Sequence, residues 1–187
     1  MPTPDSLTRL FPSREEDVAL EGLYLQHALH RAQLRETPLV YSNFIESLDG
    51  RIAIAHPETG EKGVPAAITN PRDWRLYQEL AAQADILVTS ARYVRDFAAG
   101  EAQDALPLSD DPAYADLHAW RKEQGLAPQP AVVVLSASLD LPLEVLCEKL
   151  ERPVYVATGA QADPERIKTL QAAGATAVSY THLRAHE

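Results

Sequence analysis

The second half of the chain alternates short apolar runs with segments of helical spacing. Ile86-Leu87-Val88 and the run 131–135 (Ala-Val-Val-Val-Leu) have the continuous apolar character of buried parallel strands. Shorter runs follow at 154–157 and 175–178, and helical patterns at 113–124, 143–150 and 164–173 lie between and before them. This alternation predicts an α/β fold with a mostly parallel sheet, flanked by helices and joined by right-handed crossovers.

Two helix starts are marked by capping residues. Thr69 or Asn70 is expected to cap a helix whose first residue is Pro71, with Asp73 in its first turn. Ser90 follows the apolar run 86–88 and is expected to cap the next helix.

The first 37 residues are predicted to form a lead-in and one helix. Ser13 and Glu16 have the spacing of a capping box, and apolar residues continue to Leu34, which predicts a helix from Ser13 to Leu34. His27 and His30 would lie one turn apart on it. No third ligand is in view, so a solvated helix face is favoured over a metal site.

The stretch 40–54 is interpreted as two β-rich runs on either side of Ser47 to Gly50. Asp49-Gly50 is a strong signal for a tight turn between strands. In a strand before that turn, Asn43 and Ser47 would lie on one face and Glu46 on the other. Ligands bind beyond the carboxyl ends of strands in open α/β sheets, so the stretch is predicted to border a site.

Composition narrows the function classes. A chain of 187 residues is most simply one domain, and its net charge of -10 argues against a nucleic-acid partner. Cys147 is the only cysteine, which excludes a disulfide framework and a thiolate metal site. No signal peptide or membrane-spanning run is apparent, so a cytoplasmic protein without a membrane partner is expected.

The helix that follows Ser90 carries a possible anion site. A strand, a tight turn and a helix N-terminus together present free backbone amides and a favourable dipole to a phosphate. Arg92 and Arg95 lie one turn apart just inside this helix, and with Ser90 they would suit the 2′-phosphate of NADPH. A surface helix with solvated arginines explains the same residues equally well. No motif for a metal, a nucleophile elbow or a Rossmann glycine loop is present.

Three short motifs resemble the motifs of a known protein family. The segment 47–53 (Ser-Leu-Asp-Gly-Arg-Ile-Ala) resembles the S-L-D-G-[KR]-x-A signature of the reductase domain of bacterial riboflavin biosynthesis, in the dihydrofolate-reductase-like superfamily. The segment 68–71 (Ile-Thr-Asn-Pro) is similar to that family's I-T-[GS]-P, and 82–89 is similar to its A-Q-x-D-A-I-L-V-G. The resemblance covers about residues 38–178, which are expected to form the reductase-like domain.

The resemblance implies a three-layer dihydrofolate-reductase-like sandwich and a homodimer. It also implies NADPH-dependent reduction of the ribosylamino group of a pyrimidine ribotide, a small-molecule substrate. The candidate residues, some implied by the resemblance and others indicated by the residue pattern itself, fall into three groups: catalytic Ser47 and Asp49; substrate-binding Asn43, Glu46 and Asn70; and cofactor-binding Gly50, Thr69, Thr89, Ser90, Arg92, Arg95 and Ser136. The Asp-Gly turn alone explains the type of Asp49 at least as well as catalysis does.

At two positions the chain departs from the family pattern, and these differences leave the identity of the substrate undetermined. The family pattern has a lysine where this chain has Asn43 and an arginine where it has Ala81. Another small heterocycle is therefore an alternative substrate, and a non-catalytic nucleotide-binding module is an alternative function. Residues 179–187 have no counterpart in the pattern, so they are expected to lie outside the domain, with the last strands of the sheet missing.

Overall fold

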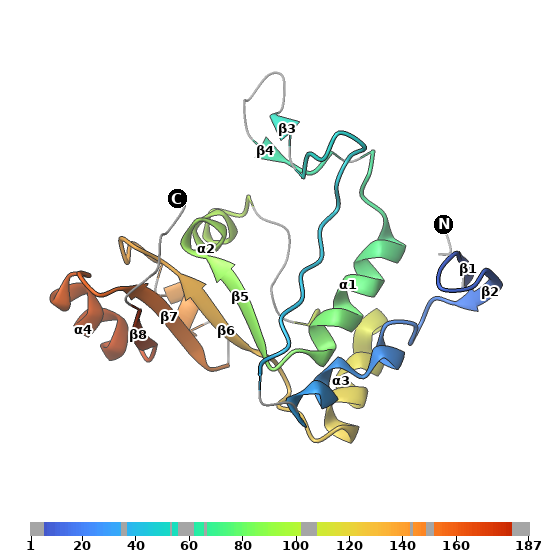
Figure 1. Ribbon diagram of the computed structural model, residues 1–187. Coiled ribbons are helices and arrows are strands. Elements are labelled where there is room, and N and C mark those ends of the chain that lie inside the picture. Colours follow the sequence, from blue (N-terminus) through green and yellow to red (C-terminus); the bar gives the residue numbers. More distant parts are fainter. Residues whose placement is uncertain are drawn as a thin grey trace. The chain divides into compact units, whose positions relative to one another are not determined.

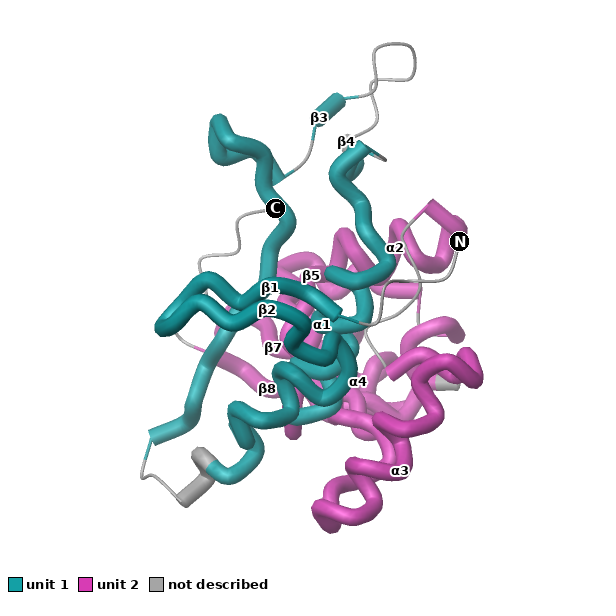
Figure 2. Tube along the Cα trace, turned by 90° about the vertical axis from the view of Figure 1, so that its right-hand side faces the viewer, with its two compact units in different colours: residues 1–83 teal, residues 84–187 magenta. Residues whose placement is uncertain are grey.

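A computed structural model describes residues 6–34, 37–52, 54–55, 62–65, 67–101, 108–142, 144–148 and 152–180. The chain divides into two compact units, residues 1–83 and residues 84–187 (Figure 2). Each unit is described by itself.

The second unit is built on a four-stranded parallel sheet (Figure 1). Its strands are β5 (Ile86–Ser90), β6 (Ala131–Leu135), β7 (Val154–Gly159) and β8 (Thr176–Tyr180), arranged in sequence order. All three pairings are parallel. The predicted α/β fold with a parallel sheet and helices is thus confirmed.

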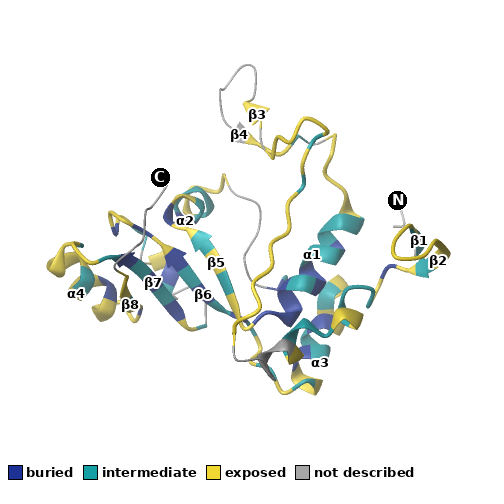
Figure 3. Ribbon diagram, in the orientation of Figure 1, coloured by how far each residue is buried: buried dark blue, intermediate teal, exposed yellow. Residues whose placement is uncertain are grey.

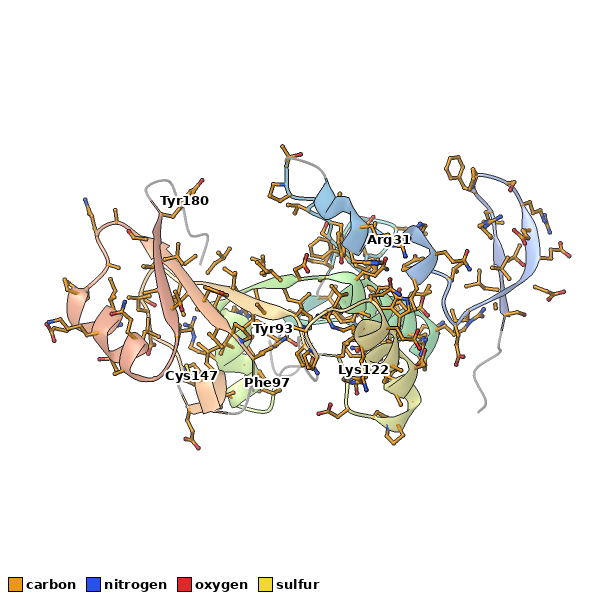
Figure 4. All side chains as sticks on the ribbon, turned by 90° about the horizontal axis from the view of Figure 1, so that it is seen from below. Arg31, Tyr93, Phe97, Lys122, Cys147 and Tyr180 are labelled. Carbon is orange, nitrogen blue, oxygen red and sulfur yellow. The ribbon has the colours of Figure 1, made fainter. Side chains whose placement is uncertain are left out.

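One face of this sheet carries the core of the unit. Val132 and Val134 of β6 are in register with Val154 and Val156 of β7, so their side chains share a face. Three helical segments pack against it: α2 (Ala91–Ala98), the five-residue π-helical segment η4 (Glu144–Glu148) and α4 (Pro164–Ala172). They contribute Val94, Leu146 and Leu170, while Cys147 is partly buried beside them (Figure 4).

The opposite face of the sheet is largely exposed (Figure 3). Ile86 and Val88 of β5 are 50% and 63% exposed, and Tyr180 at the end of β8 is 57% exposed. The same face includes Leu135 and Val178, both of which are also exposed. The second unit therefore presents an apolar sheet face, which we call the open face.

The remaining helix of the second unit is α3 (Ala115–Glu123), preceded by the 3-10 turn η3 (Pro112–Tyr114). Its Arg121 is buried and donates hydrogen bonds to the carbonyl oxygens of Ala84 (2.9 Å) and Ala127 (2.7 Å). The buried guanidinium ties the loop after α3 to the start of the unit.

The first unit is organised by α1 (Pro71–Gln83), which begins at the predicted residue. The predicted helix from Ser13 to Leu34 is wrong. Strands β1 (Ser6–Arg9) and β2 (Glu15–Ala19) form an antiparallel hairpin there. Two short 3-10 helices follow, η1 (Leu25–His27) and η2 (Leu29–Leu34).

Side chains of α1 form hydrogen bonds with backbone groups of the segment 22–29. The Glu79 carboxylate accepts from the backbone N–H groups of Gly22 (2.6 Å) and Tyr24 (2.8 Å). Gln83 accepts from the N–H of Leu29 and donates to the carbonyl of Tyr24, both at 2.8 Å. These bonds hold the segment 22–29, which precedes all three reductase-like motifs in the sequence, on helix α1.

The predicted strand before Ser47 is wrong as well, and so is its pairing with the run that follows Gly50. Residues 38–46, all of them described, have no regular secondary structure, and Figure 3 shows this segment exposed along most of its length. The strand β3 (Ile54–Ala55) pairs instead with β4 (Lys62–Gly63). Tyr41 anchors the segment through a hydrogen bond from its hydroxyl to the carbonyl of Leu80 (2.8 Å).

Strand β8 runs two residues beyond the predicted strand. Ser179 and Tyr180 pair with Thr158 and Gly159 and therefore belong to the sheet. Residues 181–187 lie outside the described residues. None of the helices in the described ranges is long and apolar enough to cross a membrane.

Candidate functional site

The carboxyl ends of the four parallel strands lie along one edge of the sheet, which we call the carboxyl edge. The strands end there at Ser90, Leu135, Gly159 and Tyr180. Helix α2 begins directly after β5, and α4 begins soon after β7, so both helix N-termini also lie toward this edge. In open parallel sheets this is where ligands bind.

Ser90 is the N-cap of α2, as predicted. Its backbone is extended, and its hydroxyl accepts a hydrogen bond from the N–H of Tyr93 (3.3 Å). Thr89 points to the other side, because its register partner is the buried Val134 on the helix-covered face. Of these two predicted cofactor residues, only Ser90 lies on the open face.

The two arginines predicted to bind the cofactor have different partners in the structure. Arg92 forms an exposed ion pair with Asp96 (Nε to Oδ2, 3.7 Å). Arg95 instead donates from Nη1 to the backbone carbonyl of Asp140 (3.0 Å), in the loop after β6. The guanidinium of Arg95 is therefore held at the carboxyl edge.

The loop after β6 is shaped by serine hydroxyls. Ser136 is 2% exposed, and its Oγ accepts from the N–H of Leu139 (3.0 Å), whose backbone has φ of 59°. The Oγ of Ser138 accepts from the N–H of Asp140 (3.3 Å). Ser136, predicted to contact the cofactor, thus serves to hold this loop in shape.

The signature turn in the first unit is closed by its own side chains. Gly50 N–H donates to the carbonyl of Ser47 (2.8 Å), and Ser47 N–H donates to the carbonyl of Arg51 (3.0 Å). The Ser47 hydroxyl donates to Oδ1 of Asp49 (2.5 Å), and Asp49 Oδ2 pairs with Nε of Arg51 (3.1 Å). Gly50 has φ of 78°, a left-handed conformation that favours glycine.

The turn therefore exists without the predicted strands. Both oxygens of the Asp49 carboxylate have partners within the turn, which supports the structural interpretation of this residue. Asn43 and Glu46, predicted to bind substrate, are exposed on the segment before the turn.

The remaining predicted residues lie at the start of α1. Asn70 accepts from the N–H of Arg72 through Oδ1 (2.9 Å) and so caps the helix, and Thr69 precedes it on the surface. In the first turn, burial raises the pKa of the Asp73 carboxyl above its ordinary 3.8. Burial has this effect because it disfavours the charged carboxylate.

The structure thus brings Ser90, Arg95 and Ser136 to one edge of the second unit. Ser47, Asp49 and Gly50 share one turn of the first unit. Within the described parts of the chain, no group of three or more His, Cys, Asp or Glu residues is arranged to hold a metal ion.

Arg166 was missed by the sequence analysis. It lies on α4 and donates from Nη1 to the backbone carbonyl of Ser138 (2.7 Å) in the loop after β6. Its position in the first turn of the helix that follows β7 was a usable signal, because the N-terminus of that helix lies toward the same edge as Ser90.

Comparison with known proteins agrees with this fold. Residues 38–186 match the RibD C-terminal domain, and the chain therefore belongs to the RibD C-terminal domain family. This is the family of riboflavin-pathway pyrimidine reductases that the motifs indicated. A search of curated proteins returned no match.

Among solved structures, a pyrimidine reductase-like protein from Corynebacterium diphtheriae is similar, with a TM-score of 0.52 and 19% sequence identity. The alignment covers 76% of this chain and 54% of that chain, so the present chain spans about half the length of that relative. At this identity the likeness shows the fold alone.

Proposed function

We propose that this chain is an NADPH-dependent reductase that acts on a pyrimidine ribotide in riboflavin biosynthesis. The observation that carries the proposal is the match of residues 38–186 to the RibD C-terminal domain. Conversion of a ribosylamino group to a ribitylamino group adds two hydrogens, one as hydride and one as a proton. NADPH, when bound, supplies the hydride.

The residues at the carboxyl edge fit a phosphate-bearing nucleotide. The N-terminus of α2 directs backbone N–H groups toward this edge, with Ser90 as its cap. Arg95 adds a guanidinium held in place by the carbonyl of Asp140. Arginine forms bidentate hydrogen bonds with phosphate oxygens, so Arg95 together with Ser90 would hold a phosphate group of the cofactor.

Further candidate residues lie in the first unit. Thr69 and Gly50 are proposed to contact the nicotinamide end, and Asn43, Glu46 and Asn70 are proposed to bind the substrate. Ser47 and Asp49 are the proposed catalytic residues. Because both side chains are bonded within the turn, their role would be to hold the turn against the reacting groups. The active form is proposed to be a cytoplasmic homodimer.

Two measurements test the proposal. Thermal unfolding of the full chain should shift upward with NADPH and much less with NADH, because a ligand that binds only the native state stabilises it. Oxidation of NADPH should then depend on an added ribosylamino pyrimidine phosphate. Absence of both effects would contradict the reductase function.

A second function is favoured by two residues. Asn43 and Ala81 stand where the family pattern has basic residues, which favours either another heterocycle or a nucleotide-binding module without catalysis. A shift in unfolding with NADPH, but no oxidation with any tested acceptor, would support the binding module.

A further inference from the structure

Two arginines from different helices converge on the loop 136–140 at the carboxyl edge. Arg95 of α2 donates to the carbonyl of Asp140 (3.0 Å), and Arg166 of α4 donates to the carbonyl of Ser138 (2.7 Å). The two acceptors are alternate residues of one loop, so both guanidinium groups are held beside it. Both of these bonds are to neutral carbonyls, which do not cancel the positive charges, and Arg166 also forms an exposed ion pair with Asp163 at 4.0 Å.

The loop between the two arginines is rigidly built. Ser136 and Ser138 each accept a backbone N–H within the loop, and the side chain of Leu139 is buried in the core of the unit. A loop anchored in this way fixes the position of the carbonyl groups that hold the arginines. Little ordering would then be required when an anion binds, which favours affinity.

The acidic groups near the loop do not use all the N–H donors of Arg95 and Arg166. Asp163 Oδ2 lies 4.0 Å from Arg166 Nε, while Oδ1 of the same carboxylate caps α4 by accepting from Glu165 N–H. Asp140 is exposed and contacts Arg95 through its backbone carbonyl. A guanidinium carries five N–H donors, and the hydrogen bonds described here use one donor each from Arg95 and Arg166.

We propose that Arg166, together with Arg95 and the Ser138 hydroxyl, forms the subsite for a phosphomonoester, and that Arg166 determines the preference for NADPH over NADH. The inference rests on the proposed function, since it assigns the 2′-phosphate of that cofactor. Arg92 is not part of this subsite, because its ion pair is with Asp96 on its own helix and not with the loop 136–140.

The test measures dissociation constants of NADPH and NADH for the full chain and for two matched variants. R166Q removes the charge but keeps a long polar side chain, and we expect it to weaken NADPH binding at least about tenfold while NADH binding changes less than twofold, because a charge-assisted hydrogen bond to the 2′-phosphate is lost. R14Q is the control, because Arg14 is an exposed arginine that pairs with Glu16 and belongs to no proposed site, and it should leave both constants within about twofold.

A second variant covers the case in which R166Q unfolds. R166K keeps the charge but loses the fork geometry, so NADPH affinity should fall between wild type and R166Q. Equal weakening of NADPH and NADH, or no change in either, would overturn the inference while leaving the reductase proposal intact. If the wild-type chain binds neither nucleotide, both proposals are wrong.

Discussion

The strongest single test of the first unit is the removal of the Glu79 carboxylate. Glu79 is fully buried on α1 and has three donors: the N–H groups of Gly22 and Tyr24, and Nε of Arg75 at 3.0 Å. The side chain of Arg75 is itself 7% exposed. In E79A, two backbone amides and one buried guanidinium lose a charged acceptor at the same time.

The expected cost follows from these contacts. Breaking a buried ion pair by removing one partner costs about 3–5 kcal/mol. Each buried amide left without its acceptor adds about 1–3 kcal/mol, although neighbouring terms do not simply add. We therefore expect E79A to lower the free energy of unfolding by at least about 3 kcal/mol. E79Q keeps the shape and one oxygen, so it should cost less.

Urea unfolding and amide exchange together provide the assay. The amides of Gly22 and Tyr24 should exchange much faster in E79A, which reports the release of segment 22–29 even if the two units unfold separately. E165A is the control, because Glu165 is an exposed helical glutamate paired with Lys168 (2.7 Å) and should change stability by about 0.5 kcal/mol or less. A loss under 1 kcal/mol in E79A, with both amides still protected, would refute the reasoning.

Three further outcomes are expected from single substitutions. S90A should destabilise α2 by about 1 kcal/mol in urea unfolding, through loss of the bond to Tyr93 N–H, and an unchanged midpoint would contradict the N-cap assignment. G50A should cost roughly 1–2 kcal/mol, because φ of 78° strains any other residue although a Cβ there would meet no atom within 4 Å. Asp73 binds its proton more tightly in the folded state, so stability contributed by its protonation is lost as pH rises from below 3.8 through the raised folded pKa. As pH rises through this range, the free energy of unfolding of the wild type should fall relative to that of D73N. Parallel curves of unfolding free energy against pH for the two proteins would contradict the raised pKa of Asp73.

Local signals in the sequence predicted the elements whose partners lie nearby. The Asn70 and Ser90 caps, Pro71 and the apolar run 131–135 each specify their own segment, and the structure confirms all of them. The caps act on donors only two or three residues away, so no distant part of the chain has to be known.

Non-local contacts overrode the helix predicted from Ser13 to Leu34. Glu15 pairs with Arg9 across the β1–β2 hairpin, and Asp17 adopts φ of 56°, which no helix allows. Further on, Glu79 and Gln83 bind backbone groups of residues 22–29. Nothing in the first 34 residues indicates that acceptors more than fifty residues away would replace helical bonds.

The strand predicted within residues 38–46 is absent for a related reason. The β-rich composition before the Asp-Gly turn predicts a strand, but a strand forms only where a neighbour supplies backbone partners. The turn at Ser47 to Arg51 formed because its bonds are local. In the candidate site, the spacing of Arg92 and Arg95 could not reveal that each would bond in a different direction, or that Arg166 would approach from another helix.

The open face of the sheet has a consequence for behaviour in solution. Exposed Ile86, Val88 and Tyr180 favour contact between copies, whereas a net charge of -10 keeps the copies apart. Salt weakens only the second effect, because the range of the repulsion falls to about 8 Å at physiological ionic strength. Self-association should therefore increase with added salt and approach its maximum near pH 5.0, where the net charge vanishes. The concentration at which this chain stays dispersed is set by its charge, and buffers for its study are best kept well above that pH and low in salt.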